Sequence, residues 1–300
     1  MPSARPPLSI SQVSTLSASF DEDLSAYRAA GLDGIGIWEI KLADGDDAAT
    51  AERLRKSGLA STNAVPAVPS ILPLHLMPGP ADPRERVEAL CASIARLARF
   101  EPASIVFLTG SGRGLGDARA IAVEGVKRLA EAADRAGIRI GLEPYQRVDG
   151  EPWTIVSSIA DAAELLDEAD APTVGITFDV WHLWNSPRLY EDIEAHAERF
   201  TAVHVSDYRK PTRGWADRVL PGDGVADVPR ILAALERAGW RGPLDLEIFS
   251  DDGTFGTIYP HSLWAWDARE LAERGRAALE TAVAQSAKQG EGLVAAKTRS

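Results

Sequence analysis

Three carboxylates and one imidazole occur in the second half of the chain. The distance in sequence from one to the next is close to the combined length of one strand and one helix. They are Glu143 in IGLEPY, Asp179 in GITFDVWH, His204 in AVHVSDY and Glu247 in LDLEIFS, with gaps of 36, 25 and 43 residues. Each ends a short apolar run that favours a strand. A ligand set of carboxylate oxygens and one imidazole nitrogen suits Mn²⁺, Mg²⁺ or Co²⁺, with Zn²⁺ as an alternative. The pattern therefore predicts a site for one divalent metal ion.

Eight apolar runs alternate with amphipathic stretches, and these elements must position the four residues. The predicted strands are 8–14, 34–39, 60–65, 104–109, 139–143, 174–179, 202–206 and 244–249. The predicted helices between them are 21–30, 47–57, 83–99, 117–136, 159–169, 189–199 and 228–238, several of them followed by a glycine that is typical of a helix C-terminus. Eight such units predict an α/β fold, a single (β/α)₈ TIM barrel whose strands all end at one mouth. An open doubly wound sheet is the alternative, but it would not bring four successive strand ends to one centre.

No linker divides the chain, so residues 1–284 are predicted to form the barrel. The last helix is expected to run from about Ser262 to about Ala284. Residues 285–300 are polar and rich in small side chains, which predicts a flexible C-terminal tail. The long segments 66–82, 144–157 and 207–226 all follow strands, and loops on that side of a barrel build the active site.

Composition limits the partners that the chain can have. A net charge of −12 argues against nucleic acid, whose binding depends on cationic contacts to phosphates. No apolar stretch approaches the ~20 residues of a membrane span, so no membrane partner is expected. The single cysteine, Cys91, lies in an apolar helical pattern and provides no disulfide framework, which favours a cytoplasmic protein. Whether the chain forms a homo-oligomer is left open.

Five motifs, in this order, resemble the xylose isomerase-like superfamily of sugar isomerases and epimerases. They are LEP with Glu143, FDVWH with Asp179 and His182, HVSD with His204, RVLPGDG with Arg218, and LDLEIF with Glu247. The resemblance covers most of the chain and implies a TIM barrel with one bound divalent metal ion. It does not identify the substrate, because the superfamily includes ketose epimerases, aldose–ketose isomerases, hydroxypyruvate isomerases, inosose dehydratases and abasic-site endonucleases.

The resemblance also implies a role for each site residue. The metal ligands would be Glu143, Asp179, His204 and Glu247. Glu143 and Glu247 would also be the catalytic acid and base, one on each face of the substrate. His182 and Arg218 would bind substrate oxygens, although Arg209 and Arg213 lie in the same loop and could replace Arg218.

Tryptophans just beyond strand ends are expected to wall the pocket, because aromatic rings stack on the C–H faces of sugars. Trp38 and Trp181 are the main candidates, and Trp153 and Trp184 are two more. Asp207 would orient either His204 or a loop amide.

We therefore predict a divalent-metal-dependent isomerase or epimerase that acts on a small keto-sugar or related polyol through an enediolate intermediate. The metal would chelate two adjacent oxygens of a hydroxy-ketone, and a carboxylate would remove the neighbouring C–H proton. The alternative is a lyase of the inosose dehydratase kind, which removes water from a keto-polyol. The chain has only five histidines and an acidic net charge, which argues against an abasic-site endonuclease. The complete set of four ligands argues against a non-catalytic sugar-binding barrel.

Overall fold

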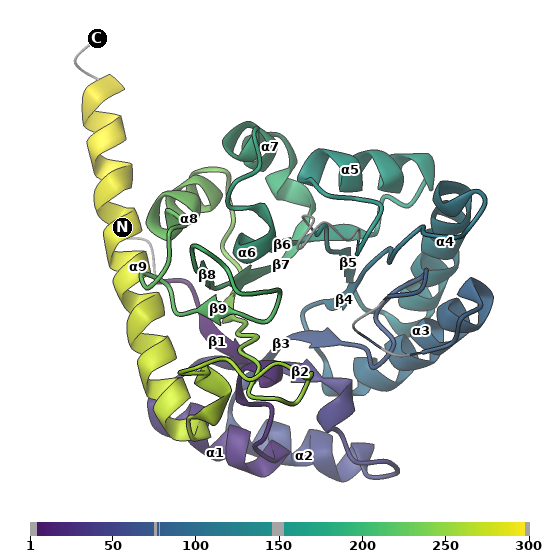
Figure 1. Ribbon diagram of the computed structural model, residues 1–300, viewed down its shortest axis with the longest axis horizontal. Helices are drawn as coiled ribbons and strands as arrows, with labels where there is room; N and C mark the ends of the chain where they lie inside the picture. Colours follow the sequence, from purple (N-terminus) through teal and green to yellow (C-terminus); the bar gives the residue numbers. More distant parts are fainter. Residues whose placement is uncertain (1–4, 75–76, 78, 146–152, 298–300) are drawn as a thin grey trace.

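Eight parallel strands close into a barrel at the positions of the apolar runs, with helices around it (Figure 1). The computed structural model describes residues 5–74, 77, 79–145 and 153–297, of which 290–297 as backbone only. The strands are β1 (Leu8–Ser11), β2 (Gly34–Trp38), β3 (Ala60–Val65), β4 (Ile105–Phe107), β5 (Ile140–Leu142), β6 (Gly175–Asp179), β7 (Phe200–Val205) and β10 (Leu244–Leu246). Neighbouring strands follow chain order, and β1 pairs with β10 to close the ring. The predicted TIM barrel is confirmed, and the open sheet is excluded.

The predicted helices form the outer layer. They are α1 (Phe20–Ala30), α2 (Asp47–Ser57), α3 (Pro83–Leu97), α4 (Ala118–Ala136), α5 (Ile159–Glu168), α7 (Leu189–His196), α8 (Val228–Arg237) and α9 (Ala268–Lys297). Short 3₁₀ turns are η1 (Gln12–Thr15), η2 (Glu39–Lys41), η3 (Ala98–Phe100), η4 (Ala197–Arg199) and η5 (Leu263–Ala265). Gly31 and Gly137 end α1 and α4 at φ values of 75° and 64°, which a residue with a side chain rarely adopts. Within the described residues, no helix has both the length and the apolar content needed to cross a membrane.

One continuous cluster of buried apolar side chains joins the strands to the helices. It includes Ile35 in β2, Leu90 in α3 and Leu235 in α8, and the partly buried Cys91 packs against it. Burial of apolar surface stabilises the fold by roughly 25 cal/mol per Å². This shared core fixes the strands relative to one another and therefore fixes the side chains at their ends.

A polar layer occupies the barrel interior. The Asp245 carboxylate of β10 accepts hydrogen bonds from Asn63 Nδ2 at 2.9 Å and Thr62 Oγ1 at 3.3 Å, and from the Ser9 hydroxyl. Since β3 and β10 are not neighbours in the barrel, these contacts cross its interior. Asp245 lies two residues before Glu247, so both side chains point to the same face of the strand.

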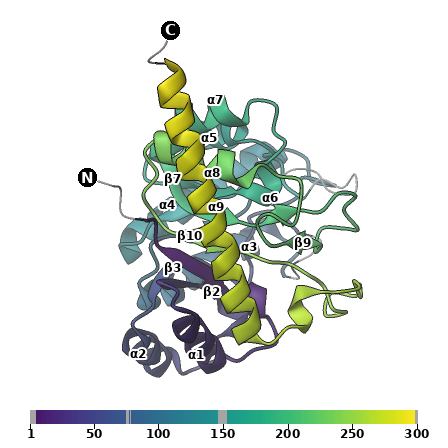
Figure 2. The same cartoon turned by 90° about the vertical axis from the view of Figure 1, so that its left-hand side faces the viewer.

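The last helix differs from the prediction at both ends. It begins at Ala268 instead of Ser262 and continues to Lys297 instead of ending at Ala284. The backbone of residues 285–297 is thus helical where a tail was predicted, because the alanines, glutamines and lysines of that segment are also good helix formers. Residues 298–300 lie outside the described residues. Helix α9 packs against α1 and α8, and Figure 2 shows its C-terminal end projecting past the barrel.

Two small elements that the sequence did not predict lie on the C-terminal side of the barrel. The four-residue helix α6 (Val180–Leu183) follows β6 directly. The segment 207–226 contains a two-stranded antiparallel hairpin of β8 (Asp207–Tyr208) and β9 (Arg218–Val219). The hairpin carries Arg218 toward the strand ends.

Candidate metal centre

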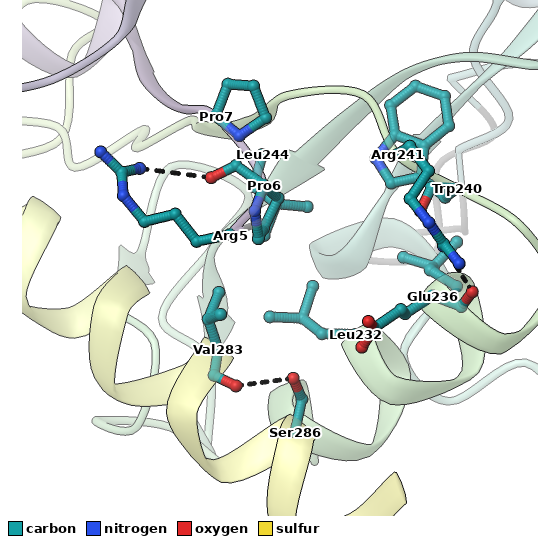
Figure 3. Close-up of a pocket in the computed structure, with 11 residues that line it drawn as sticks. Arg5, Pro6, Pro7, Leu232, Glu236, Trp240, Arg241, Leu244, Val283 and Ser286 are labelled. Atoms are coloured by element: carbon teal, nitrogen blue, oxygen red, sulfur yellow. Dashed lines mark hydrogen bonds between the residues drawn. The ribbon is translucent and has the colours of Figure 1, made fainter. Parts of the chain in front are cut away.

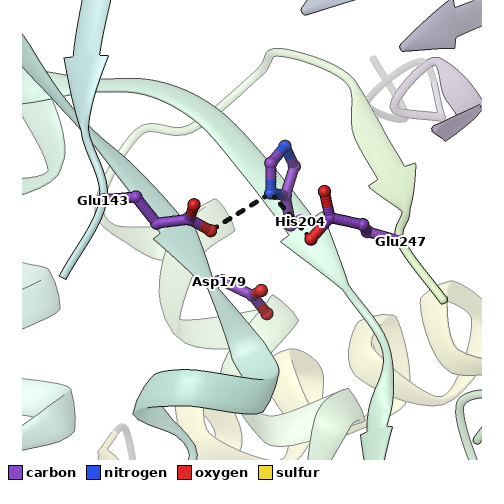
Figure 4. Close-up of side chains that lie close together, drawn as sticks. All are labelled: Glu143, Asp179, His204 and Glu247. Atoms are coloured by element: carbon purple, nitrogen blue, oxygen red, sulfur yellow. Dashed lines mark hydrogen bonds and ion pairs between the residues drawn. The ribbon is translucent and has the colours of Figure 1, made fainter. Parts of the chain in front are cut away.

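The four predicted ligands converge at the C-terminal ends of their strands. One ligand atom from each of Glu143, Asp179, His204 and Glu247 lies within 4.8 Å of the others, and all four residues are buried (Figure 4). Asp179 and His204 are paired in register on β6 and β7, while Glu143 and Glu247 directly follow β5 and β10. The parallel strands therefore assemble the site that their spacing predicted.

Two glutamates flank the imidazole. His204 Nδ1 lies 3.3 Å from Glu143 Oε1 and 3.5 Å from Glu247 Oε2, and Figure 4 shows the ring between the two carboxylates. Asp179 Oδ1 accepts the backbone N–H of Trp181 at 2.7 Å and so caps α6. That bond fixes the carboxylate and leaves Oδ2 for the centre.

Burial and mutual charge shift the pKa values of this group. Burial raises the pKa of Glu143 to about 7, although its hydrogen bond with His204 acts in the opposite direction. Burial opposes ionisation of Glu247, but His204 and Arg218 outweigh it and hold the pKa of that carboxyl below its usual value. Burial also disfavours the charged form of His204, yet Glu247 and Glu143 raise its pKa well above the usual value. In the absence of an ion, the group therefore retains protons at neutral pH.

The donor set fits a divalent cation. Metal–ligand bonds of about 2.0–2.3 Å place opposite ligands up to roughly 4.6 Å apart, close to the observed spread. Three buried carboxylates facing one imidazole and one guanidinium also leave negative charge that a cation would neutralise.

Arg218 reaches into this centre from β9. Its Nη1 lies 2.8 Å from Asp179 Oδ2 and 3.1 Å from Glu247 Oε2, and its Nη2 lies 3.2 Å from His182 Nε2. The guanidinium is buried between the rings of Trp181 and Phe249. The sequence alternatives Arg209 and Arg213 instead form ion pairs with Asp217.

The predicted pocket residues take different positions. Trp38 and Trp153 line a cavity of about 40 Å³ that opens onto Glu143, Arg218 and Glu247. Trp181, which was also predicted to wall the pocket, lies in α6; its side chain is fully buried and its ring lies against the Arg218 guanidinium. The buried His182 ring stacks on Tyr145, with ring centroids 3.6 Å apart. Neither Trp181, Trp184 nor His182 is among the described residues that line the cavity.

Sequence reasoning missed three aromatic residues of this cavity. Tyr145, Trp215 and Phe249 line it beside Trp38 and Trp153. All three lie just past strands or in the long segment 207–226, so their positions on the βα side were the available signal. Asp207, for which two roles were open, accepts backbone N–H groups of Tyr208, Gly222 and Ala226 and thus holds the loop.

A larger cavity of about 400 Å³ lies at the opposite end of the barrel, between α8, α9 and the segment before β1 (Figure 3). Several of its polar groups pair within the chain, although the Trp240 indole N–H is buried without a hydrogen-bond partner among the described residues. Arg241 donates to the carbonyls of Glu236 and Trp240, Ser286 donates to the Val283 carbonyl, and Arg5 pairs with Asp33. The described residues that line the cavity include no cluster of metal ligands or acid–base groups, so it is not the candidate site.

Comparisons with known proteins agree with the fold. The family model described as the xylose isomerase-like TIM barrel matches residues 24–282. The 3-dehydroshikimate dehydratase of Pseudomonas putida is 28% identical over 81% of this chain and 38% of its own length. The inosose isomerase of Bacillus licheniformis is 26% identical over 44% of this chain and 48% of its own length. The L-ribulose 3-epimerase of Methylomonas sp. is 27% identical over 76% of this chain and 78% of its own length. The chain thus spans less than half the length of the first two.

Solved structures show the same fold. A protein of Sinorhizobium meliloti 1021 has a TM-score of 0.80 at 23% identity, covering 92% of this chain and 98% of that one. The IOLI protein with a bound zinc atom has a TM-score of 0.76 at 18% identity, covering 93% of this chain and 99% of that one.

Proposed function

Because the chain belongs to the xylose isomerase-like TIM barrel family, we propose that it is a divalent-metal-dependent isomerase or epimerase of a small hydroxy-ketone, a keto-sugar or a related polyol. The observation that carries this proposal is the buried pair Glu143 and Glu247, which flanks His204 at the mouth of the barrel. Relatives named as epimerases and isomerases support it.

Four residues would hold the ion: Glu143, Asp179, His204 and Glu247. A divalent ion bound there supplies a Lewis acid that polarises a substrate carbonyl. Asp179 is fixed by its bond to the Trp181 N–H, so its part is to bind and orient. Among the described residues, the carboxylates of the two glutamates meet the side chains of His204 and Arg218 instead of a backbone N–H, and they are the better candidates for proton transfer.

Glu143 and Glu247 would move the protons. A buried carboxylate is a stronger base than an exposed one, and burial raises the pKa of Glu143 to about 7, near the value that suits a general base. One glutamate would remove the proton from the carbon beside the carbonyl, which gives an enediolate. Return of a proton from the opposite glutamate inverts that carbon, whereas return to the neighbouring carbon isomerises the substrate.

Arg218 and His182 would orient the substrate. The Arg218 guanidinium is a planar fork already directed at the ligand carboxylates, so it lies beside any oxygen that approaches them. His182 is held by Arg218 on one side and by the Tyr145 ring on the other. Trp38 would contribute to the pocket wall, and Trp181 would act through its packing on Arg218.

The alternative is a dehydratase. It is favoured by the 28% identity to a 3-dehydroshikimate dehydratase over most of this chain. The same carboxylate would remove the proton beside a carbonyl, and a hydroxyl on the next carbon would leave as water. The acid–base residues are therefore the same for both reactions.

Product mass separates the two reactions. Metal-loaded protein is incubated with keto-sugars and keto-inositols, and the products are analysed by mass spectrometry and NMR. We expect products that conserve the mass of the substrate. A product lighter by one water would replace the isomerase proposal with the dehydratase. The control variant is Glu168→Gln, which changes an exposed α5 residue that pairs with Arg119. This variant should convert the substrates to the same products as the native protein does.

A further inference from the structure

Among the described lining residues of the cavity above the candidate metal site, charged groups lie only at its base. Glu143, Arg218 and Glu247 provide the charged groups among the described lining residues. The rest of the described wall is aromatic or aliphatic. Its aliphatic members are Val65, Pro69, Leu74, Met77, Val106 and Leu108.

The wall offers few hydrogen bonds to a ligand. Above the charged base, its described polar side-chain groups are indole N–H groups and the Tyr145 phenol, and the Trp38 indole already donates to Ser11 Oγ at 2.8 Å. Each additional hydroxyl on a substrate would lose its water partners without finding new ones. An unpaired buried hydroxyl lowers affinity by roughly tenfold or more.

The aromatic residues form a connected surface. Trp215 meets Trp153 with ring centroids 5.7 Å apart and Phe249 at 5.6 Å, and Phe249 meets Trp38 at 5.6 Å. Broad ring faces bury apolar surface best against a flat or ring-shaped ligand. The cavity, at about 40 Å³, is narrow and must widen to admit a substrate. Because the space is narrow, a bound substrate will stay in contact with these walls.

From these contacts we infer that the substrate is a cyclic hydroxy-ketone with few other hydroxyl groups, not an open-chain polyhydroxylated ketose. Its adjacent oxygens would face Glu143, Glu247 and Arg218, and its apolar ring would pack against the aromatic wall. This inference rests on the proposed function and names the substrate class of the same site.

Three hydroxy-ketones with the same reactive end test the inference. Acetoin and erythrulose share a four-carbon skeleton and differ by two hydroxyls, while 2-hydroxycyclohexanone adds an apolar ring. Binding to metal-loaded protein is measured by calorimetry. We expect 2-hydroxycyclohexanone to bind most tightly, acetoin next, and erythrulose at least about tenfold more weakly than the ring. Equal or tighter binding of erythrulose, or binding of none of the three, would overturn the inference.

A matched pair of variants tests whether the wall sets this preference. Leu108 lines the cavity just after β4 and is 3% exposed. Leu108→Asn places a hydrogen-bonding group in the wall and should reduce the preference for the ring severalfold. Leu108→Met keeps the wall apolar and should preserve the preference. Thermal midpoints and metal content establish that both variants are folded and loaded, and an unchanged preference in Leu108→Asn would overturn the inference.

Exchange of the α-hydrogen with deuterated solvent, followed by NMR, separates this inference from the proposed function. Ring-selective binding without any exchange would contradict the proton-transfer function and leave the substrate class standing. Exchange that is fastest with erythrulose would support proton transfer and overturn the substrate class.

Discussion

Arg218 holds a fixed positive charge beside two of the four residues that would bind the metal. Its Nη1 contacts Asp179 Oδ2 and Glu247 Oε2, so an incoming ion must share these carboxylates with the guanidinium. The arginine thereby favours the ionised form of both carboxylates against the effect of burial, and it would remain beside the ion as a donor to substrate oxygen.

Replacing Arg218 should therefore affect substrate more than metal. We expect Arg218→Ala to lower kcat/KM by roughly tenfold or more, because a charged hydrogen bond contributes about 1.5–3 kcal/mol. Metal affinity should stay the same or rise, since a competing cation is gone. Steady-state kinetics and metal titration measure the two effects. Arg209→Ala, whose side chain pairs with Asp217, is the control. Loss of metal together with activity would show that Arg218 is needed to form the metal site.

Metal affinity should rise with pH through about 7. Burial raises the pKa of Glu143 to about 7, and the two glutamates raise the pKa of His204 well above its usual value. Both groups hold protons below these values, and the protons must leave before the ligands bind an ion. Calorimetric titration at several pH values, in buffers with different ionisation enthalpies, measures the affinity and the protons released. A pH-independent affinity with no proton release would contradict these pKa directions.

At the scale of single elements, β5 depends on a small residue to place Glu143. A Cβ at Gly141 would lie 2.5 Å from Thr177 Oγ1 and would also collide with Thr201 Oγ1. Glycine therefore lets β5 sit where the side chains of β6 and β7 leave no further room.

Gly141→Ala should destabilise the protein and weaken metal binding. Overpacking of this kind costs typically ~1–3 kcal/mol, and the displaced strand would carry Glu143 with it. Chemical denaturation and metal titration measure the two losses. Gly116→Ala is the matched control, because a Cβ there meets nothing within 4 Å. Native stability in Gly141→Ala would mean that the barrel relaxes without moving the site.

The elements also show what the sequence could predict. All eight barrel strands were predictable because apolar runs, helix periodicity and terminal glycines agree with one another. Helix α6 and the β8–β9 hairpin were not, because segments of four and two residues carry no periodic signal. The convergence of Glu143, Asp179, His204 and Glu247 followed from strand spacing alone. The neighbours of Arg218 and the aromatic wall did not, because tertiary contacts set the path of long loops.

On the scale of the whole molecule, the barrel concentrates negative charge at one end of its interior. The net charge is −12, and three carboxylates of the site are buried together. A bound cation would relieve this repulsion and stabilise the folded protein in proportion to its occupancy.

Metal loading should therefore raise the thermal midpoint. At about 100 times the dissociation constant a ligand stabilises the folded state by ~2.7 kcal/mol, which corresponds to several degrees for a protein of this size. Differential scanning calorimetry after chelation and after addition of Mn²⁺, Mg²⁺, Co²⁺ or Zn²⁺ measures the shift. His204→Ala and Asp179→Asn should lose most of it. An equal shift in these variants would place the metal elsewhere.

The proposed function depends most directly on proton transfer by Glu143 and Glu247, and solvent-deuterium incorporation tests that transfer. Metal-saturated native protein, Glu143→Gln and Glu247→Gln are compared on the separate enantiomers of a hydroxy-ketone in deuterated water, with metal content measured in each. We predict deuterium at the α-carbon with native protein and a loss of roughly 10²–10⁴-fold in each variant. The two variants should differ in which enantiomer they still exchange, because each keeps one working face. Full exchange by both variants, or product without solvent deuterium, would contradict the account.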